Sequence, residues 1–168
     1  MELQEFTRLV GLLREKGLHI SAAESCTGGL FCAKLVEVPN ASKVFGYGFV
    51  TYAAEAKSAL LGVDPADIKR FGVVSEPVAR QMAAGAAKSA GADVAVGITG
   101  YAGPKASEND DTVGTVCFGY YLSGSVFAET VFFGDIGRTA VREKSARHAA
   151  AALCRLLENG SEHETETV

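Results

Sequence analysis

The spacing of apolar residues along the chain predicts alternating helices and strands. One face of residues 2–16 is apolar at intervals of three and four residues, through Leu3, Phe6, Leu9, Val10, Leu12 and Leu13. Such spacing is typical of an amphipathic helix, and Gly17 supplies the residue that often ends one.

The later segments alternate in the same way. In chain order the pattern predicts a strand at 18–23, a helix from the residues after Ser25 to about Val36, a strand at 45–52, helices at 53–61 and from Asp64-Pro65, a helix at 76–90 capped by Ser75, a strand at 93–98, a hairpin of strands 113–122 and 125–133, and a long helix at 138–157. Helices alternating with apolar strands predict an α/β fold: a single-domain α/β/α sandwich with a mixed sheet and a C-terminal hairpin plus long helix.

Domain organisation follows from the same pattern. We expect one domain over residues 1–158, without internal repeats or linkers, and a polar, acidic and disordered tail over 159–168.

Three predicted loops, 24–29, 52–57 and 99–104, follow strands. Ligands in such sheets bind beyond the C-terminal ends of the strands, so these loops are expected to meet at one site.

Composition narrows the function classes. The 168 residues are 48% hydrophobic and 21% charged, as in a soluble globular domain. No run has the length of a membrane helix and the first residues lack a signal pattern, so we expect a cytoplasmic protein without membrane contact. A net charge of −4 argues against nucleic acid as a partner.

The most reactive candidate is the turn at residues 25–29, where Ser25, Cys26 and Thr27 precede Gly28-Gly29. A helix beginning there would point its free amides toward Ser25, which suits a nucleophile and an oxyanion. An ordinary helix cap explains a serine there equally well. Cys26 is a rival nucleophile, because a helix N-terminus can activate a thiol.

The other cysteines, Cys32, Cys117 and Cys154, lie in apolar segments and are expected to be buried. No cysteine spacing fits a zinc site.

Tyr52 and Lys57 follow the 45–52 strand. Each is commonplace alone, but together with Ser25 they fit a Ser-Lys-Tyr site, in which a buried lysine takes the serine proton.

These motifs, in this order, resemble the CinA C-terminal-domain family, the nicotinamide-nucleotide amidohydrolases. The resemblance rests on AESCTGG at 23–29, GFVTY at 48–52, EAK at 55–57, LLGV at 60–63, VSE at 74–76, GITGYAGP at 97–104, VGTV at 113–116, FGD at 133–135, and Arg138 with Arg142. It spans roughly residues 5 to 157.

The resemblance implies hydrolysis of the carboxamide of nicotinamide mononucleotide to nicotinic acid mononucleotide and ammonia, without metal or cofactor. It implies Ser25 as nucleophile, Lys57 as general base and Tyr52 as proton relay, with an acyl-enzyme intermediate. The substrate-binding residues would be Cys26, Thr27, Gly28, Gly48, Thr99, Gly100 and Arg142. Amides near Cys26 would hold the oxyanion.

The substrate phosphate needs a cation. Arg138 and Arg142 share one face of the last helix, and the resemblance favours Arg142.

One segment departs from the family: residues 105–111, KASENDD, stand where further glycines are usual. Their acidic side chains lack the spacing of a calcium loop.

A second function class stays open: a non-catalytic pyridine-nucleotide-binding module of the competence/damage-inducible type. Many family members carry a second half resembling a molybdopterin-binding fold. No such half is present in this chain, so we expect a stand-alone enzyme. Exposed sheet faces make a homo-oligomer, most simply a dimer, the expected assembly.

Overall fold

Five strands form one mixed sheet in the computed structural model, which describes residues 3–159. The strands are β1 (Ile20–Glu24), β2 (Phe45–Val50), β3 (Val94–Gly100), β4 (Thr115–Leu122) and β5 (Ser125–Phe132). Their order across the sheet is β2-β1-β3-β4-β5. β1 pairs in parallel with β2 and β3, whereas β4 and β5 run antiparallel as a hairpin. The predicted mixed sheet and C-terminal hairpin are confirmed.

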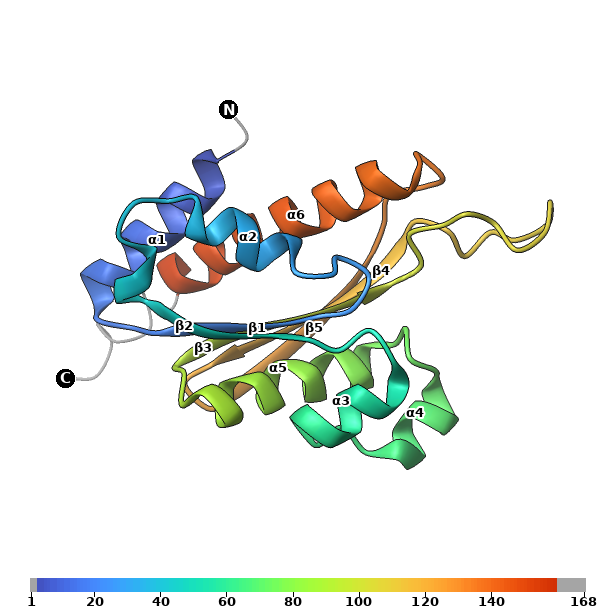
Figure 1. The fold of residues 1–168 in the computed structure, drawn as a ribbon, viewed down its shortest axis with the longest axis horizontal. Coiled ribbons are helices and arrows are strands. Elements are labelled where there is room, and N and C mark those ends of the chain that lie inside the picture. The colour runs from blue at the N-terminus through green and yellow to red at the C-terminus, as the bar shows by residue number, and fades with distance from the viewer. Residues whose placement is uncertain (1–2, 160–168) are drawn as a thin grey trace.

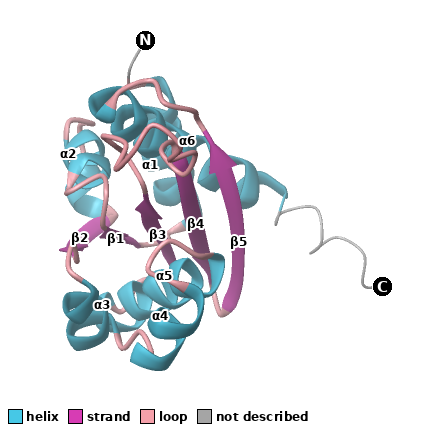
Figure 2. Ribbon diagram, turned by 90° about the vertical axis from the view of Figure 1, so that its right-hand side faces the viewer, coloured by secondary structure: helices cyan, strands magenta, loops and turns pink. Residues whose placement is uncertain are grey.

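Helices cover both faces of the sheet (Figure 1). One layer holds α1 (Gln4–Lys16), α2 (Leu30–Val36) and α6 (Arg138–Asn159); the other holds α3 (Ala54–Leu61), α4 (Pro65–Phe71) and α5 (Glu76–Ala90). A short 3-10 helix, η1 (Ala41–Lys43), which the pattern did not predict, precedes β2. Figure 2 shows the two layers from the side, with β2 and β5 at opposite edges of the sheet. The predicted sandwich is therefore correct.

The central strands are buried on both sides. Every residue of β1 is buried, and so is β3 up to Thr99, as expected of strands covered by helices on both faces. The edge strands keep exposed aromatic residues, such as Tyr47 on β2 and Phe132 on β5. The homo-oligomer stays a prediction. Among the described residues, no helix is long and apolar enough to cross a membrane.

Helix α5 packs unusually close to the sheet. Gly97 and Gly119 are partners across β3 and β4, and both lie beneath α5. A Cβ atom at Gly97 would lie 2.5 Å from the Ala79 carbonyl oxygen, and one at Gly119 would collide with the same carbonyl. Two glycines in register therefore let the α5 backbone touch the strands.

Three local predictions were wrong. The Ser75 hydroxyl does not cap α5; it donates to the Gly72 carbonyl instead. Cys117 and Cys154 are buried as predicted, but Cys32 is only partly buried. Helix α6 extends to Asn159, so the first residue of the predicted tail is helical. Residues 160–168 lie outside the described residues.

Candidate active site

The loops after β1, β2 and β3 meet in one hollow of about 180 Å³, as the topology predicts. The lining residues are Ser25, Cys26, Tyr52, Lys57, Val73, Val74, Thr99, Gly100, Tyr101, Ala102 and Arg138. Of the residues predicted from sequence, the structure brings together at this hollow Ser25, Cys26, Tyr52, Lys57, Thr99 and Gly100. Val73 gave no signal in the sequence, and Val74 was noted only as part of the VSE motif.

Ser25 and Lys57 are in direct contact. Lys57 Nζ lies 3.0 Å from Ser25 Oγ. Ser25 follows the last residue of β1, and its amide donates to the Ile98 carbonyl on β3 at 2.9 Å. Lys57 lies in the first turns of α3 and reaches back toward β1. The contact therefore links the end of β1 to α3, the helix that follows β2.

The Lys57 side chain is only 1% exposed, which is exceptional for lysine. Burial lowers the pKa of its ammonium group below the ordinary 10.5. Besides Ser25, its Nζ contacts the carbonyl oxygens of Thr51 at 2.7 Å and Tyr52 at 3.4 Å. Those oxygens orient the amine, and a neutral amine beside a hydroxyl can act as a general base. The Thr51 carbonyl was not predicted, because no pattern in the sequence shows which carbonyl oxygen a buried lysine will contact.

Tyr52 lines the hollow and is tied to Arg138. Its side chain is 62% exposed, and its hydroxyl accepts a hydrogen bond from Arg138 at 2.9 Å. Arg138 also donates to the Gly103 carbonyl. The guanidinium thus joins the loops after β2 and β3 at the start of α6. Whether the Tyr52 hydroxyl relays a proton stays a prediction.

The turn at residues 25–29 has a defined set of hydrogen bonds. The Gly28 amide donates to the Ser25 carbonyl at 3.1 Å, and Gly28 has a φ of +60° that favours glycine. Arg142 donates to the Cys26 carbonyl at 3.1 Å and to the Thr27 carbonyl at 2.9 Å. Arg142, predicted to bind the substrate phosphate, is thereby bonded to the backbone of the turn.

The start of α2 differs from the prediction. This helix begins at Leu30, and the amides of Gly29, Phe31 and Cys32 donate to the carboxylate of Glu24. These amides therefore do not point at Ser25. Within residues 3–159, the amides of Cys26 and Thr27 have no hydrogen-bond acceptor in the protein, whereas the amide of Gly28 does. Of these two residues only Cys26 lines the hollow, since Thr27 is fully buried, so the oxyanion role predicted for the turn is left to the Cys26 amide.

Cys26 lies beside the nucleophile candidate but in an unreactive state. Burial raises the pKa of its thiol to about 11. A thiol with that pKa carries little thiolate at neutral pH, and the thiolate is the reactive form. Among the described residues, Lys57 Nζ bonds to Ser25 Oγ and not to the Cys26 thiol, and this geometry favours Ser25 over Cys26 as nucleophile.

The remaining predicted binding residues have structural contacts. The Thr99 hydroxyl donates to the Val73 carbonyl at 2.8 Å, which ties the wall of the hollow to β3. Thr27 is fully buried, so its side chain does not reach the hollow. Gly48 packs against α2: a Cβ atom there would lie 2.5 Å from Cys32 Sγ. Substrate contacts by Thr27 and Gly48 stay predictions.

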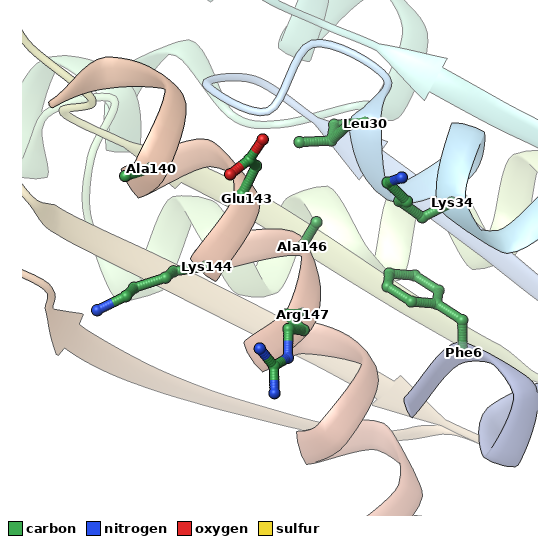
Figure 3. Close-up of a pocket in the computed structure, with 8 residues that line it drawn as sticks. All are labelled: Phe6, Leu30, Lys34, Ala140, Glu143, Lys144, Ala146 and Arg147. Atoms are coloured by element: carbon green, nitrogen blue, oxygen red, sulfur yellow. The ribbon is translucent and has the colours of Figure 1, made fainter. Parts of the chain in front are cut away.

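A second cavity, of about 200 Å³, lies on the other side of the turn (Figure 3). It is bounded by α1, α2 and α6, and its lining residues are Phe6, Leu30, Lys34, Ala140, Glu143, Lys144, Ala146 and Arg147. Its lining holds no serine, cysteine or threonine and none of the residues predicted from the sequence to be catalytic.

The loop at residues 105–111, which departs from the family pattern, is organised around Asp110. Its carboxylate accepts from the amides of Ala106 and Thr112 and from the Thr112 hydroxyl, and these bonds lower the pKa of Asp110 to about 2. The loop extends outward from the sheet (Figure 1). No residue of 105–111 lines the hollow at Ser25.

Comparison with known proteins places this fold in one class, the α/β domains of competence/damage-inducible proteins. The sequence profile of the CinA C-terminal domain matches residues 4–157. A CinA-like protein of Chlorobaculum tepidum is 51% identical over 144 residues, which is 82% of this chain and 34% of that protein. A CinA-like protein of Kosmotoga olearia is 44% identical over 149 residues, covering 89% of this chain and 36% of that protein.

Solved structures agree with the sequence relatives. A CinA superfamily protein from Escherichia coli has a TM-score of 0.88 at 35% identity, covering 93% of this chain and 90% of that one. The competence/damage inducible protein from Agrobacterium tumefaciens has a TM-score of 0.87 at 39% identity, covering 93% and 96%. The chain belongs to the CinA C-terminal domain family. It spans about a third of the length of the curated relatives it matches.

Proposed function

We propose that the domain hydrolyses the carboxamide of nicotinamide mononucleotide, giving nicotinic acid mononucleotide and ammonia. The observation that carries the proposal is the 3.0 Å contact between Ser25 Oγ and the buried Nζ of Lys57. A lysine with a lowered pKa beside a serine is a nucleophile and general base pair. The substrate class comes from the family resemblance of the motifs around these residues.

The first half of the reaction forms an acyl-enzyme. Neutral Lys57 removes the Ser25 proton as Oγ attacks the carboxamide carbon, which gives a tetrahedral oxyanion. The unpaired amide of Cys26 is the donor available to that oxygen, because Thr27 is fully buried and does not line the hollow. The Lys57 ammonium then protonates the carboxamide nitrogen, the carbon–nitrogen bond breaks, and ammonia leaves.

The second half regenerates the enzyme. Lys57, neutral again, removes a proton from a water molecule as the water oxygen attacks the acyl carbon. The bond to Ser25 Oγ then breaks, and Oγ recovers the proton from Lys57. The Thr51 carbonyl at 2.7 Å from Nζ supports both steps, because it can hold the ammonium each time Lys57 is charged. The route needs only groups of the protein and water.

The phosphate of the substrate needs a cation near the mouth of the hollow. Both arginines have partners in the protein, but Arg138 lines the hollow and is exposed, whereas Arg142 is half-buried against two carbonyls of the turn. This arrangement supports Arg138 as a phosphate contact in addition to the predicted Arg142. A guanidinium suits phosphate because its donors are arranged as a planar fork.

The test is ammonia release from nicotinamide mononucleotide by the natural protein, Ser25→Ala and Lys57→Ala. We expect release by the natural protein and a loss of at least about a hundredfold in each variant. A natural protein that binds the nucleotide without releasing ammonia would support the binding-module alternative instead. Release that persists in Ser25→Ala would overturn the nucleophile assignment.

A further inference from the structure

We propose that Glu24 is a positioning residue for Ser25: its carboxylate closes the 25–28 turn and thereby fixes the nucleophile against Lys57. The inference rests on the proposed function, because it concerns the geometry of the same pair. Glu24 does not line the hollow and does not touch the reacting atoms. It acts through the backbone of the turn.

The carboxylate is fully engaged by one short segment of backbone. Oε2 accepts from the amides of Gly29 at 3.0 Å and Phe31 at 3.1 Å, and Oε1 accepts from the amide of Cys32 at 2.9 Å. The Glu24 side chain is completely buried. A buried carboxylate is costly unless its oxygens are hydrogen-bonded, and these three bonds, at the positive end of α2, meet that requirement.

The same residue is also fixed at its backbone. Glu24 is the last residue of β1, where it pairs with Val50 on β2 and Ile98 on β3. Its carbonyl accepts from the Thr51 amide at 2.8 Å. The backbone of Glu24 therefore anchors the start of the turn to the sheet, and its side chain anchors the end of the turn to α2. Four residues, 25–28, are held between these anchors.

This arrangement is not an ordinary helix cap. The residue at the N-cap of α2, Gly29, has no side chain to offer, and no side chain caps the helix from that position. The acceptor comes instead from a strand five residues earlier in the sequence. Because the Glu24 side chain belongs to β1 and holds the first amides of α2, it fixes the distance between β1 and α2. Ser25 lies in the turn that connects the two elements.

The consequence for chemistry is geometric. The Ser25 backbone sets where Oγ lies relative to Lys57 Nζ, which approaches from a different element at 3.0 Å. A reacting group displaced by about 1 Å can lose about a hundredfold in rate. Glu24 does not line the hollow, and Arg138, the proposed phosphate contact, lies outside the 25–28 turn. Weakening the turn should therefore reduce kcat far more than it changes KM.

Glu24→Gln is the test variant, because it keeps the side-chain volume and replaces one acceptor oxygen with a donor that must face a backbone amide. Glu129→Gln is a matched control. Glu24, Ile98, Phe118 and Glu129 form one row across the sheet, so Glu129 lies roughly 14 Å away at about 4.8 Å per strand. Glu129 is also an acceptor for two hydrogen bonds, from Tyr120 and His148.

Two readouts separate the outcomes: steady-state ammonia release from nicotinamide mononucleotide, and the rate at which a fluorophosphonate labels Ser25. We expect Glu24→Gln to lose about tenfold to a hundredfold in kcat and in labelling rate, with KM within about threefold. Glu129→Gln should keep natural values. A folded Glu24→Gln with natural kcat and labelling rate overturns the inference.

Folding and function are checked separately. Melting temperatures of both variants show whether Glu24→Gln is folded; if it is not, Glu24→Asp, which keeps the charge but shortens the reach, takes its place with the same expected losses. A natural protein that is labelled at Ser25 but releases no ammonia contradicts the proposed function alone. Slower labelling of the Glu24 variant would then still support the positioning role.

Discussion

Lys57 Nζ lies 3.0 Å from Ser25 Oγ, although the two residues are 32 positions apart and belong to different elements. The amine is buried against the Thr51 carbonyl, and the hydroxyl opens into the hollow between the strand ends. Burial lowers the pKa of the Lys57 ammonium group, so the amine loses its proton more easily. The Ser25 hydroxyl beside it lines the hollow, where a substrate can reach it. This contact determines the first three predictions below.

The rate should rise with pH as Lys57 loses its proton. Only the neutral amine can act as a base, and burial lowers the pKa of Lys57 below 10.5. We expect kcat/KM for ammonia release to increase tenfold per pH unit below that lowered pKa and to reach a plateau well before pH 10.5. Lys57→Arg, whose side chain stays charged throughout, should be inactive over the whole range.

The Lys57→Met variant should be more stable than the natural protein at neutral pH. The pKa of Lys57 is lower in the folded chain than in the unfolded one, so the unfolded chain binds more protons and stability rises with pH. A methionine carries no such penalty. We expect the melting-temperature gain of Lys57→Met to be largest at low pH and to shrink as the pH approaches 10.5. A gain independent of pH would show that the pKa of Lys57 is the same in the folded and unfolded chains.

Replacing Cys26 should be far less damaging than replacing Ser25. Burial raises the pKa of the Cys26 thiol to about 11, so almost no thiolate is present at neutral pH. We expect Cys26→Ala to stay within about tenfold of the natural kcat, against a loss of at least about a hundredfold in Ser25→Ala. The opposite ranking in the ammonia assay would identify Cys26 as the nucleophile.

Tyr52 and Arg138 should act as one unit. The Arg138 guanidinium donates to the Tyr52 hydroxyl at 2.9 Å, and removing either group releases the other. We expect Tyr52→Phe and Arg138→Met to be non-additive in kcat/KM, with a coupling of about 0.5–3 kcal/mol in a double-mutant cycle. The cycle is measured with ammonia release. Additive effects would mean that the two side chains contribute independently.

Gly119→Ala should destabilise the fold without touching the site. A Cβ atom there would collide with the Ala79 carbonyl of α5. Overpacking of this kind costs typically about 1–3 kcal/mol, and a clash with backbone places the expected loss at the upper end. Urea unfolding measures it. Gly124→Ala is a control for glycine substitution at an uncrowded position, although its φ of +101° also strains alanine.

Parts of the site could be predicted from the sequence because they are local. Ser25, Lys57 and Tyr52 were identified from motifs, and the three loops were expected to converge because each follows a strand. The role of Glu24 could also have been predicted, because Glu24 is the one charged residue in β1, a strand that is buried throughout. The roles of the Thr51 carbonyl and of Val73 left no such signal.

The sequence by itself determined the order of helices and strands, the mixed sheet and the family, because apolar periodicity and short motifs are encoded residue by residue. Only the tertiary structure decided which polar groups meet. It directs the first amides of α2 to Glu24 rather than to Ser25, and it pairs Arg142 with the carbonyls of the turn. Such choices depend on distances between elements, which burial and close packing fix only after the sheet has formed.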